Sequence, residues 1–467
     1  MREDKHYFFC GIGGSGMLPL ATLMYDLGHT VAGSDRALDQ GRTTQKFQSL
    51  RDKGIRLFPQ DGSGISRANQ ILVASAAVEE GVPDVVAAQK AGAERITRAG
   101  LLADLFNAAP EAIAVGGTSG KSTTTGMLGW ILHRAGRAPT IFNGAVMKNF
   151  VSPDNPFASA VAGGPDLFVS EVDESDGSIA LFKPRIAVLN NIAFDHKPLA
   201  ELRALFHDFA NGAEIAIINI DNDETAAIAR EIPSDKVVTF GIGDARADLS
   251  ADNLVPEPEG MLFEVTEKAS GSVVPVTLRV PGGHNVENAL AALAAARATG
   301  LSLESAVECL KQFMGIKRRL DVVGTSNGVT VIDDFAHNPD KITATLATLH
   351  EFTGRLLIMF QPHGFGPLRL MEQAFVDCFT RGLQSQDVLT MPEPVYFGGT
   401  VERTVSSADI IKQICVAGCE AYAFADRAAC GDKLIELARK GDRIVIMGAR
   451  DDTLSQFASE LLDKISK

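Results

Sequence analysis

The chain has 467 residues, 45% of them hydrophobic and 22% charged, which is too long for one hydrophobic core and predicts roughly two to four globular domains. The net charge of -14 excludes a nucleic acid or an anionic membrane as the main partner, because both require a basic protein surface. No stretch approaches the roughly 20 apolar residues of a membrane helix, no signal-peptide pattern opens the sequence, and the six cysteines form no C-x-x-C pair, so we expect a cytoplasmic protein with free thiols.

Alternating strand and helix patterns fill residues 1–110, and a glycine loop connects the first strand to the first helix. The loop Gly11-Ile12-Gly13-Gly14-Ser15-Gly16 precedes this helix, and a second strand then ends at Asp35. This order is typical of a dinucleotide-type βαβ unit, although the same loop can hold any diphosphate and the acid can be a turn residue at the end of its strand. The expected strands are 7–10, 30–34 and 71–74, and the expected helices are 17–27, 82–91 and 98–106.

The stretch from Gly116 to Thr125 carries the strongest chemical signal. It follows an apolar strand and leads into an apolar helix, which is the context of a phosphate-binding loop. Lys121 would contact the β- and γ-phosphates of a nucleotide, and the Ser122 hydroxyl would ligate Mg²⁺. The loop is tighter than the usual P-loop, because Gly116 and Gly117 stand only four and three positions before Gly120. We therefore expect an ATP-dependent enzyme.

The remaining elements predict an α/β fold with three domains, 1–110, 111–319 and 320–467. Strands that alternate with helices indicate mostly parallel sheets covered on both faces. Two strands around 261–265 and 273–280, separated by Gly- and Ser-rich turns, predict a small antiparallel appendage on the central sheet. The other expected strands are 112–115, 167–169, 186–189, 215–218, 329–332, 356–360 and 444–447, and the other expected helices are 285–299, 303–314 and one that starts near Pro339.

Acidic side chains gather directly after the strand at 167–169. The stretch Glu171-Val172-Asp173-Glu174-Ser175-Asp176 has four acids within six residues. A solvated loop is the ordinary explanation for such a run, but its place at the carboxyl end of a strand beside the P-loop strand favours Mg²⁺ ligands. Asp195 and His196 follow the next strand in the same way, so His196 is a candidate second metal ligand.

Taken in order, these motifs resemble those of the Mur ligase family over nearly the whole chain. The set is specific even though each motif alone is not. Gly11 to Met17, Gly33 to Asp35 and Phe360-Gln361-Pro362-His363 narrow the resemblance to the branch that attaches L-alanine, or recycles a tripeptide, onto UDP-N-acetylmuramate. The motifs that carry the resemblance are Gly117 to Thr124, Glu171 to Asp176, Asn191 to His196, His284 to Ala289, Arg318-Arg319 and Asp333 to Pro339.

The resemblance implies an ATP-dependent ligase that activates a carboxylate as an acyl phosphate, which an amine then attacks. It implies a Rossmann-like N-terminal domain for a UDP-linked acid, a central ATPase domain that uses Mg²⁺, and a Rossmann-like C-terminal domain that brings an amino acid or a short peptide. These small-molecule substrates leave no role for nucleic acid, a membrane or NAD. The chain would act in peptidoglycan precursor synthesis as a monomer or homodimer.

The resemblance also assigns roles to residues by their motif position. The ATP ligands would be Gly117, Thr118, Gly120, Lys121, Ser122, Thr123, His284, Asn288, Arg319 and Asp334. The Mg²⁺ ligands would be Ser122, Glu171 and His196. The UDP-linked substrate would contact Gly11, Gly13, Gly14, Ser15, Gly16, Asp35 and Ser75, and the carboxylate of the amino acid would contact Arg369. The chemical step would use Lys121, His196, Arg319 and His337.

The chain departs from the family pattern at four places: three are substitutions, and the fourth is a missing lysine. Ser119 replaces a histidine, the stretch His337 to Asp340 replaces His-His-Pro-Thr, and Gly364 to Arg369 keeps a single arginine where the family has several. No lysine lies between Lys197 and Lys236, so the carbamylated lysine of other family members is missing. This absence leaves more of the metal binding to Glu171 and His196. The alternatives are therefore tripeptide recycling and a nucleotide-binding protein without ligase activity. A dehydrogenase built on the first glycine loop is less favoured, because it leaves the P-loop unused.

Overall fold

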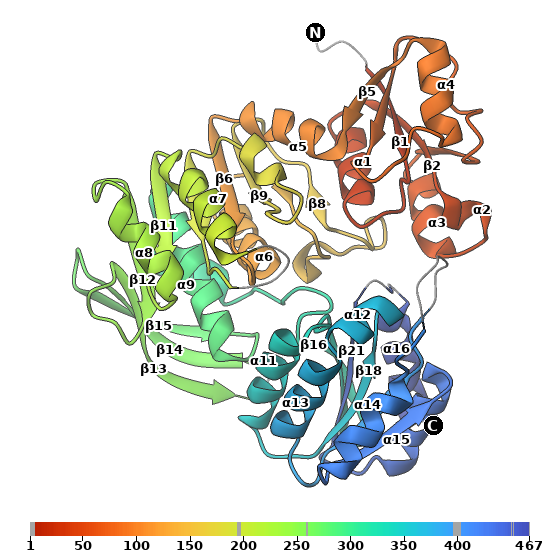
Figure 1. Cartoon of the computed structure of the whole chain (residues 1–467). Coiled ribbons are helices and arrows are strands. Elements are labelled where there is room, and N and C mark those ends of the chain that lie inside the picture. Colours follow the sequence, from red (N-terminus) through yellow and green to blue (C-terminus); the bar gives the residue numbers. More distant parts are fainter. Residues whose placement is uncertain are drawn as a thin grey trace. The chain divides into compact units, whose positions relative to one another are not determined.

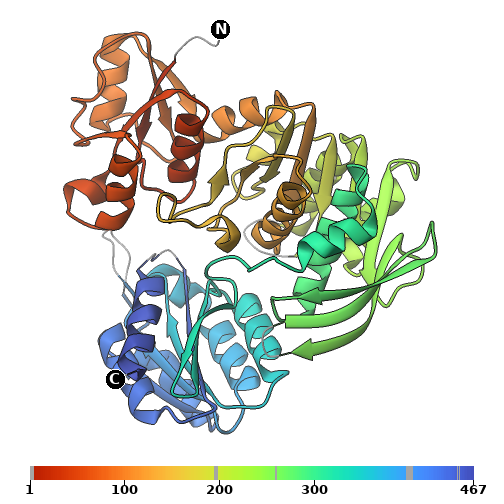
Figure 2. The same ribbon diagram turned by 180° about the vertical axis from the view of Figure 1, so that it is seen from behind.

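The computed structural model describes residues 5–193, 198–257, 260–395, 403–449, 451 and 453–466. Within these residues, three sheets with helices packed against them confirm the predicted α/β class (Figure 1, Figure 2). Contacts group the chain into two compact units: the first is Met1–Val255, Gly260–Arg279 and Gly283–Ile316, and the second is Pro256–Glu259, Val280–Gly282 and Lys317–Lys467. The first two sheets both lie in the first unit, so the division into three domains stays a prediction from the sequence.

The N-terminal sheet is parallel, with the strand order β3-β2-β1-β4-β5. Because β1 lies between β2 and β4, the glycine loop that follows β1 lies where the strand order reverses, the usual ligand-binding edge of such sheets. All six elements predicted here are present, with bounds that differ by at most one residue. The strands are β1 (His6–Cys10), β2 (Thr30–Ser34), β3 (Arg56–Phe58), β4 (Gln70–Ala74) and β5 (Glu94–Thr97), and the helices are α1 (Met17–Asp26), α2 (Arg36–Asp39), α3 (Thr44–Asp52), α4 (Pro83–Ala91) and α5 (Arg98–Asn107).

The central sheet has the order β15-β14-β13-β12-β11-β10-β6-β9-β7-β8. Its middle strands are parallel and buried on both faces, whereas β14 and β15 pair antiparallel and confirm the predicted appendage. The strands are β6 (Glu111–Gly116), β7 (Thr140–Phe142), β8 (Ala160–Val161), β9 (Leu167–Glu171), β10 (Ile186–Leu189), β11 (Ile215–Asn219), β12 (Val237–Ile242), β13 (Leu249–Glu257), β14 (Gly260–Glu267) and β15 (Ser272–Leu278). The α-helices are α6 (Lys121–Arg134), α7 (Leu199–Asn211), α8 (Asp223–Glu231), α9 (Gly283–Ala298) and α10 (Leu303–Leu310), and the short 3-10 helices are η1 (Lys148–Phe150) and η2 (Ser178–Leu181).

The helix predicted over 303–314 is too long, because α10 ends at Leu310. The chain then turns so that Phe313 and Ile316 are both buried, and Ile316 forms a β-bridge with Met147. Burial of these two side chains therefore outweighs continuation of the helix. In the described part of the chain, no helix is long and apolar enough to cross a bilayer, and all six cysteines are free thiols as predicted.

The second unit is built on a sheet of order β16-β17-β21-β18-β19-β20, in which β16 is antiparallel and the rest are parallel. Separate apolar clusters cover its two faces, one with α11, α13 and α14 and the other with α15 and α16 (Figure 1). The strands are β16 (Asp321–Ser326), β17 (Val329–Asp334), β18 (Leu356–Gln361), β19 (Val388–Pro392), β20 (Glu420–Phe424) and β21 (Arg443–Gly448). The helices are α11 (Pro339–His350), α12 (Phe365–Leu370), α13 (Glu372–Gly382), α14 (Ser407–Val416), α15 (Arg427–Leu437) and α16 (Leu454–Ile465).

Candidate active site

The phosphate-binding loop lies at the end of β6, in the middle of the central sheet, and leads directly into α6. Gly117 and Gly120 have φ angles of 132° and 83°, which side chains with a Cβ rarely adopt. A Cβ on Gly120 would also clash with the side-chain oxygen of Asn288. The first N–H groups of α6 have no acceptor within the helix, so this loop presents donors suited to an anion.

Lys121 forms an ion pair that the sequence did not predict. Its Nζ lies 2.8 and 3.1 Å from the two carboxylate oxygens of Glu174 and also donates to the carbonyl of Gly117 at 2.5 Å. The Glu174 side chain is only 8% exposed, so Lys121 is the counter-ion of a buried carboxylate. Glu174 thus holds the ammonium group of Lys121 against the loop.

Ser122 and Glu171, two of the three predicted metal ligands, are adjacent. The Ser122 hydroxyl donates to Glu171 Oε2 at 2.6 Å, and the other oxygen of Glu171 lies against Gly144, where any Cβ would clash with it. A hydroxyl and a carboxylate suit Mg²⁺, which prefers hard oxygen ligands completed by phosphate oxygens. His196, the third predicted ligand, lies outside the described residues, as does Asp195. Among the described residues, no group of three or more His, Cys, Asp or Glu side chains could hold a metal.

A buried polar network joins the P-loop helix to α9. Thr124 Oγ1 accepts from Asn190 Nδ2 at 2.9 Å and donates to Asn288 Oδ1 at 3.2 Å, and Asn288 Nδ2 donates to Asn285 Oδ1 at 3.1 Å. Asn288 was predicted to lie near the adenine, and here it is 5% exposed and held behind the loop. His284, the other predicted adenine neighbour, lies exposed in the first turn of α9.

The backbone of the first glycine loop, Gly11 to Gly16, is fixed by Asp35. One carboxylate oxygen accepts from the N–H of Gly13 at 2.8 Å, and the other caps α2 by accepting from Ala37 at 2.8 Å. The contacts of Asp35 are therefore those of a turn residue at the end of its strand. Gly14 and Ser15 lie exposed at the tip of the loop. Ser75 follows β4 at the same edge of the sheet.

Three predicted residues meet within the second unit at the end of β17. The Asp334 carboxylate is buried and accepts from the N–H of Leu320 and the hydroxyl of Thr345, each at 2.8 Å. The guanidinium of Arg319 packs on Phe335, 4.5 Å from the ring centroid. Burial, and then the positive charge of Lys341, lower the pKa of His337 to about 3. Asp334 also accepts from the N–H of Ala336, so it fixes both the segment before β16 that contains Arg319 and the segment after β17 that contains His337.

The stretch from Gly364 to Arg369, which was predicted to contact the amino acid, departs most from the family pattern. Arg369, the single predicted carboxylate partner, is exposed on α12. Arg403, which sequence reasoning did not select, packs over the ring of Phe365 at the start of the same helix, 5.3 Å from its centroid. A second guanidinium therefore reaches α12 from a distant part of the chain, and no sequence spacing indicates this.

Comparison with known proteins matches three family models: the Mur ligase family catalytic domain at residues 6–109, the Mur ligase middle domain at 115–296 and the Mur ligase glutamate ligase domain at 318–450. A UDP-N-acetylmuramate--L-alanine ligase of Agathobacter rectalis is 32% identical over 98% of both chains. The chain belongs to the Mur ligase family. As a Mur ligase, it is an ATP-dependent acid–amino-acid ligase.

Solved structures of two Mur ligases have the same fold as this one. A UDP-N-acetylmuramate-alanine ligase from Thermotoga maritima has a TM-score of 0.78, with 24% identity over 98% of both chains. A murein peptide ligase from Psychrobacter arcticus has a TM-score of 0.71, with 25% identity over 99% of both chains. The fold is therefore shared with enzymes of both kinds that the sequence motifs left open.

Besides Arg403, three residues of this Mur ligase's site were missed by sequence reasoning. Glu174 pairs with the P-loop lysine, Gly144 makes room for the carboxylate of Glu171, and Asn190 joins the two helices behind the loop. Glu174 belongs to the predicted acidic run, so the run itself was the available signal. Gly144 and Asn190 matter only through contacts with residues far away in sequence, and their own motifs give no comparable signal.

Proposed function

We propose that this Mur ligase joins an amino acid to the lactyl carboxylate of UDP-N-acetylmuramate through an acyl phosphate, in peptidoglycan precursor synthesis in the cytoplasm. The observation that carries the proposal is the presence of two glycine loops, Gly11 to Gly16 and Gly117 to Ser122, in one compact unit. One loop suits the nucleoside diphosphate of the acid and the other suits ATP. The full-length similarity to alanine ligases supports the same assignment.

The proposed chemistry needs alignment and charge neutralisation rather than covalent help from the protein. Lys121 would leave Glu174 for the phosphates of ATP, because both partners are anions that compete for one ammonium group. Ser122 and Glu171 would hold Mg²⁺, with His196 as the proposed further ligand. When bound, Mg²⁺ supplies positive charge that neutralises the phosphate oxygens.

We assign His337 a positioning role beside the reacting groups rather than proton transfer. A pKa of about 3 keeps its imidazole neutral at physiological pH, but also makes it too weak a base to deprotonate the ammonium group of an amino acid. A His337→Gln variant should therefore keep activity within about 10-fold, whereas a loss above about 100-fold at unchanged substrate affinity would indicate proton transfer.

The test of the proposal is phosphate release with ATP, Mg²⁺, UDP-N-acetylmuramate and a panel of amines. We expect release that depends on both the UDP-linked acid and one amine. ATP binding without release, with every amine including the tripeptide, would instead identify a nucleotide-binding protein that has lost ligase activity. The same assay in a size-exclusion eluate assigns activity to the monomer or the homodimer.

A tripeptide acceptor is the second candidate, because α12 carries a single exposed arginine in place of the family's arginine-rich stretch. Loss of a bidentate guanidinium weakens recognition of the carboxylate of a small amino acid, whereas a longer acceptor has other groups to bind. Comparing kcat/KM for L-alanine with kcat/KM for the tripeptide decides between them. A higher value for L-alanine would reject the recycling reaction.

A further inference from the structure

Arg98 lies directly on the first glycine loop, although no motif singled it out. It is the first residue of α5, and its side chain is 22% exposed. A Cβ built on Gly16 would lie 3.1 Å from its Cδ, 3.2 Å from one terminal nitrogen and 3.3 Å from Nε. The Cδ, the Nε and one terminal nitrogen of Arg98 therefore lie against the loop's last glycine.

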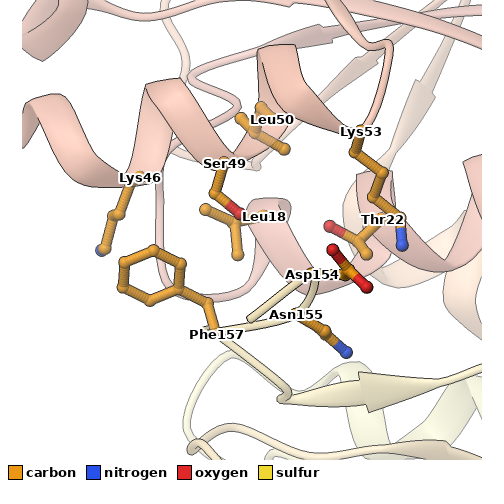
Figure 3. Close-up of a pocket in the computed structure, with 9 residues that line it drawn as sticks. All are labelled: Leu18, Thr22, Lys46, Ser49, Leu50, Lys53, Asp154, Asn155 and Phe157. Atoms are coloured by element: carbon orange, nitrogen blue, oxygen red, sulfur yellow. The ribbon is translucent and has the colours of Figure 1, made fainter. Parts of the chain in front are cut away.

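A second cation reaches the same loop from another helix. Lys46 of α3 donates to the carbonyl of Gly13 at 3.4 Å, and it also lines a small pocket between α1, α3 and the segment 154–157 (Figure 3). The chain has a net charge of -14, so an anionic substrate must be held by local cations rather than by the overall field. Cations from α3 and α5 at one glycine loop meet this requirement.

Arg98 forms a long and therefore weak ion pair with an acidic side chain, Asp176. Its terminal nitrogen lies 3.8 Å from Asp176 Oδ2, beyond hydrogen-bond distance, and the Asp176 side chain is 42% exposed. Asp176 also accepts from the N–H of Ser178 at 2.9 Å, which fixes it at the end of the acidic stretch after β9. A phosphate group that accepted two hydrogen bonds from the guanidinium would be a stronger partner than this distant carboxylate.

The far end of α5 is fixed to β9 and to the segment 181–183, so the position of Arg98 does not depend on its own side-chain contacts. Asn107 donates to the carbonyl of Leu181 at 2.9 Å and accepts from the N–H of Lys183 at 2.8 Å. The ring of Phe106 packs edge-on against Phe168 and Phe182. A helix held at its last turn therefore presents its first residue to the glycine loop.

We propose that Arg98 is a binding residue for the diphosphate of the UDP-linked acid, and that it exchanges its contact with Asp176 for this diphosphate when the substrate binds. The assignment rests on the proposed function, because it takes the first glycine loop as the site of the UDP group. It explains why a guanidinium lies against a glycine whose missing side chain leaves the backbone accessible. It also places one end of the substrate next to the acidic stretch beside the P-loop.

The experiment is titration calorimetry on the full-length protein with UDP, uridine and UDP-N-acetylmuramate. Arg98→Ala should raise the Kd for UDP by about 10- to 100-fold and leave uridine binding unchanged, because uridine has no phosphate. Arg98→Lys should recover part of the affinity, since an ammonium cannot make the bidentate contact. Asp176→Asn should tighten UDP binding slightly by removing the competing carboxylate.

Arg95→Ala is the matched control, because Arg95 lies three residues away and pairs with Glu80 at 2.5 Å instead of reaching the loop. It should bind UDP like the wild type, and all variants should bind ATP normally, which reports that the fold is intact. Equal UDP affinity in Arg98→Ala and the wild type would overturn the assignment alone. So would a penalty that appears only with UDP-N-acetylmuramate, since that places Arg98 at the carboxylate. A wild type that binds neither UDP nor UDP-N-acetylmuramate would overturn the proposed function and the assignment together.

Discussion

Lys121 combines two tasks that one substitution cannot separate. It is the proposed phosphate ligand, and it is also the counter-ion of the buried Glu174. Lys121→Ala should lower activity by at least about 100-fold, because it removes a charge that stabilises the transferring phosphoryl group. It should also cost about 1–3 kcal/mol of unfolding free energy, because it leaves a buried carboxylate unpaired.

The double variant Lys121→Ala with Glu174→Gln separates the two tasks of the lysine. Removing the carboxylate charge should restore the stability measured by urea unfolding, while phosphate release stays low. If stability does not return, the loss in the single variant has another cause than the unpaired Glu174. Return of activity in the double variant would contradict the role of Lys121 at the phosphates.

Gly144 offers a test of the metal site that leaves every proposed ligand in place. In Gly144→Ala the new Cβ would clash with Glu171 Oε1, so the carboxylate must shift, which should disturb its hydrogen bond with Ser122. The Mg²⁺ concentration for half-maximal activity should rise by about 10-fold or more, as for other changes that disturb a metal ligand's support. Gly81→Ala, whose Cβ meets no atom within 4 Å, is the control. Unchanged Mg²⁺ dependence in Gly144→Ala would contradict the proposed role of Glu171.

Glu287 on α9 should make stability fall as pH rises. Burial, and then the charge of Asp221, raise its pKa from 4.5 to about 7. Between these two values the folded protein keeps a proton that the unfolded chain has lost, so stability decreases with pH across this window and is lowest above it. Glu287→Gln, which mimics the protonated form, should be more stable at pH 8 by on the order of 2 kcal/mol. Urea unfolding from pH 4.5 to 8.5 checks this, and a difference that does not grow with pH would refute it.

At the scale of elements, the packing of α5 should be sensitive to a single truncation. Phe106 is fully buried, and its ring lies 5.6 Å from that of Phe168 and 5.3 Å from that of Phe182. Phe106→Ala should cost about 3–5 kcal/mol, because it opens a cavity between the helix and the central sheet. Leu105→Ala, which truncates a partly buried neighbour on the same helix, should cost much less. Similar losses in the two variants would mean that this helix end does not depend on the aromatic cluster.

Strong burial allowed some strands to be predicted, but it was not sufficient, because β19, whose five residues are all buried, was missed. Strands such as 186–189 are continuous apolar runs because both faces are covered, so their bounds were correct. Helix α12 was not predicted, because its six residues include a glycine and a proline that disfavour a helix. Strand β20 was also missed, and its first residue, Glu420, is exposed at the edge of the sheet.

Within the site, the sequence predicted the glycine loops and the acidic run, and the family resemblance assigned a role to Glu171 but none to Glu174. Four carboxylates lie close together from 171 to 176, and their chemistry is alike. Glu171 faces Ser122 and Glu174 faces Lys121 only because the chain leaves β9 and turns immediately. Such a choice depends on tertiary contacts, which residue type and spacing do not contain.

For the whole molecule, the two compact units should unfold separately, because each has its own apolar clusters. In the second unit, Phe360 is fully buried and packs against the rings of Phe375 and Phe379. Differential scanning calorimetry should resolve at least two transitions, and Phe360→Ala should lower one of them. Phe106→Ala should lower the other, which makes the two variants controls for each other. A single transition that both variants shift as a whole would contradict independent unfolding.

Because the C-terminal end of α5 is fixed, the length of the helix sets both how far Arg98 lies from that end and in which direction it faces. Its ten residues span about 15 Å, and each residue also turns the helix by about 100°. One inserted alanine would therefore move Arg98 only slightly along the axis but rotate it away from Gly16. An insertion of a whole turn would restore the direction and overshoot the loop. The length of α5 is thus constrained by distance and by rotation, so insertions here should be far less tolerated than in the exposed turn at 269–271 between β14 and β15.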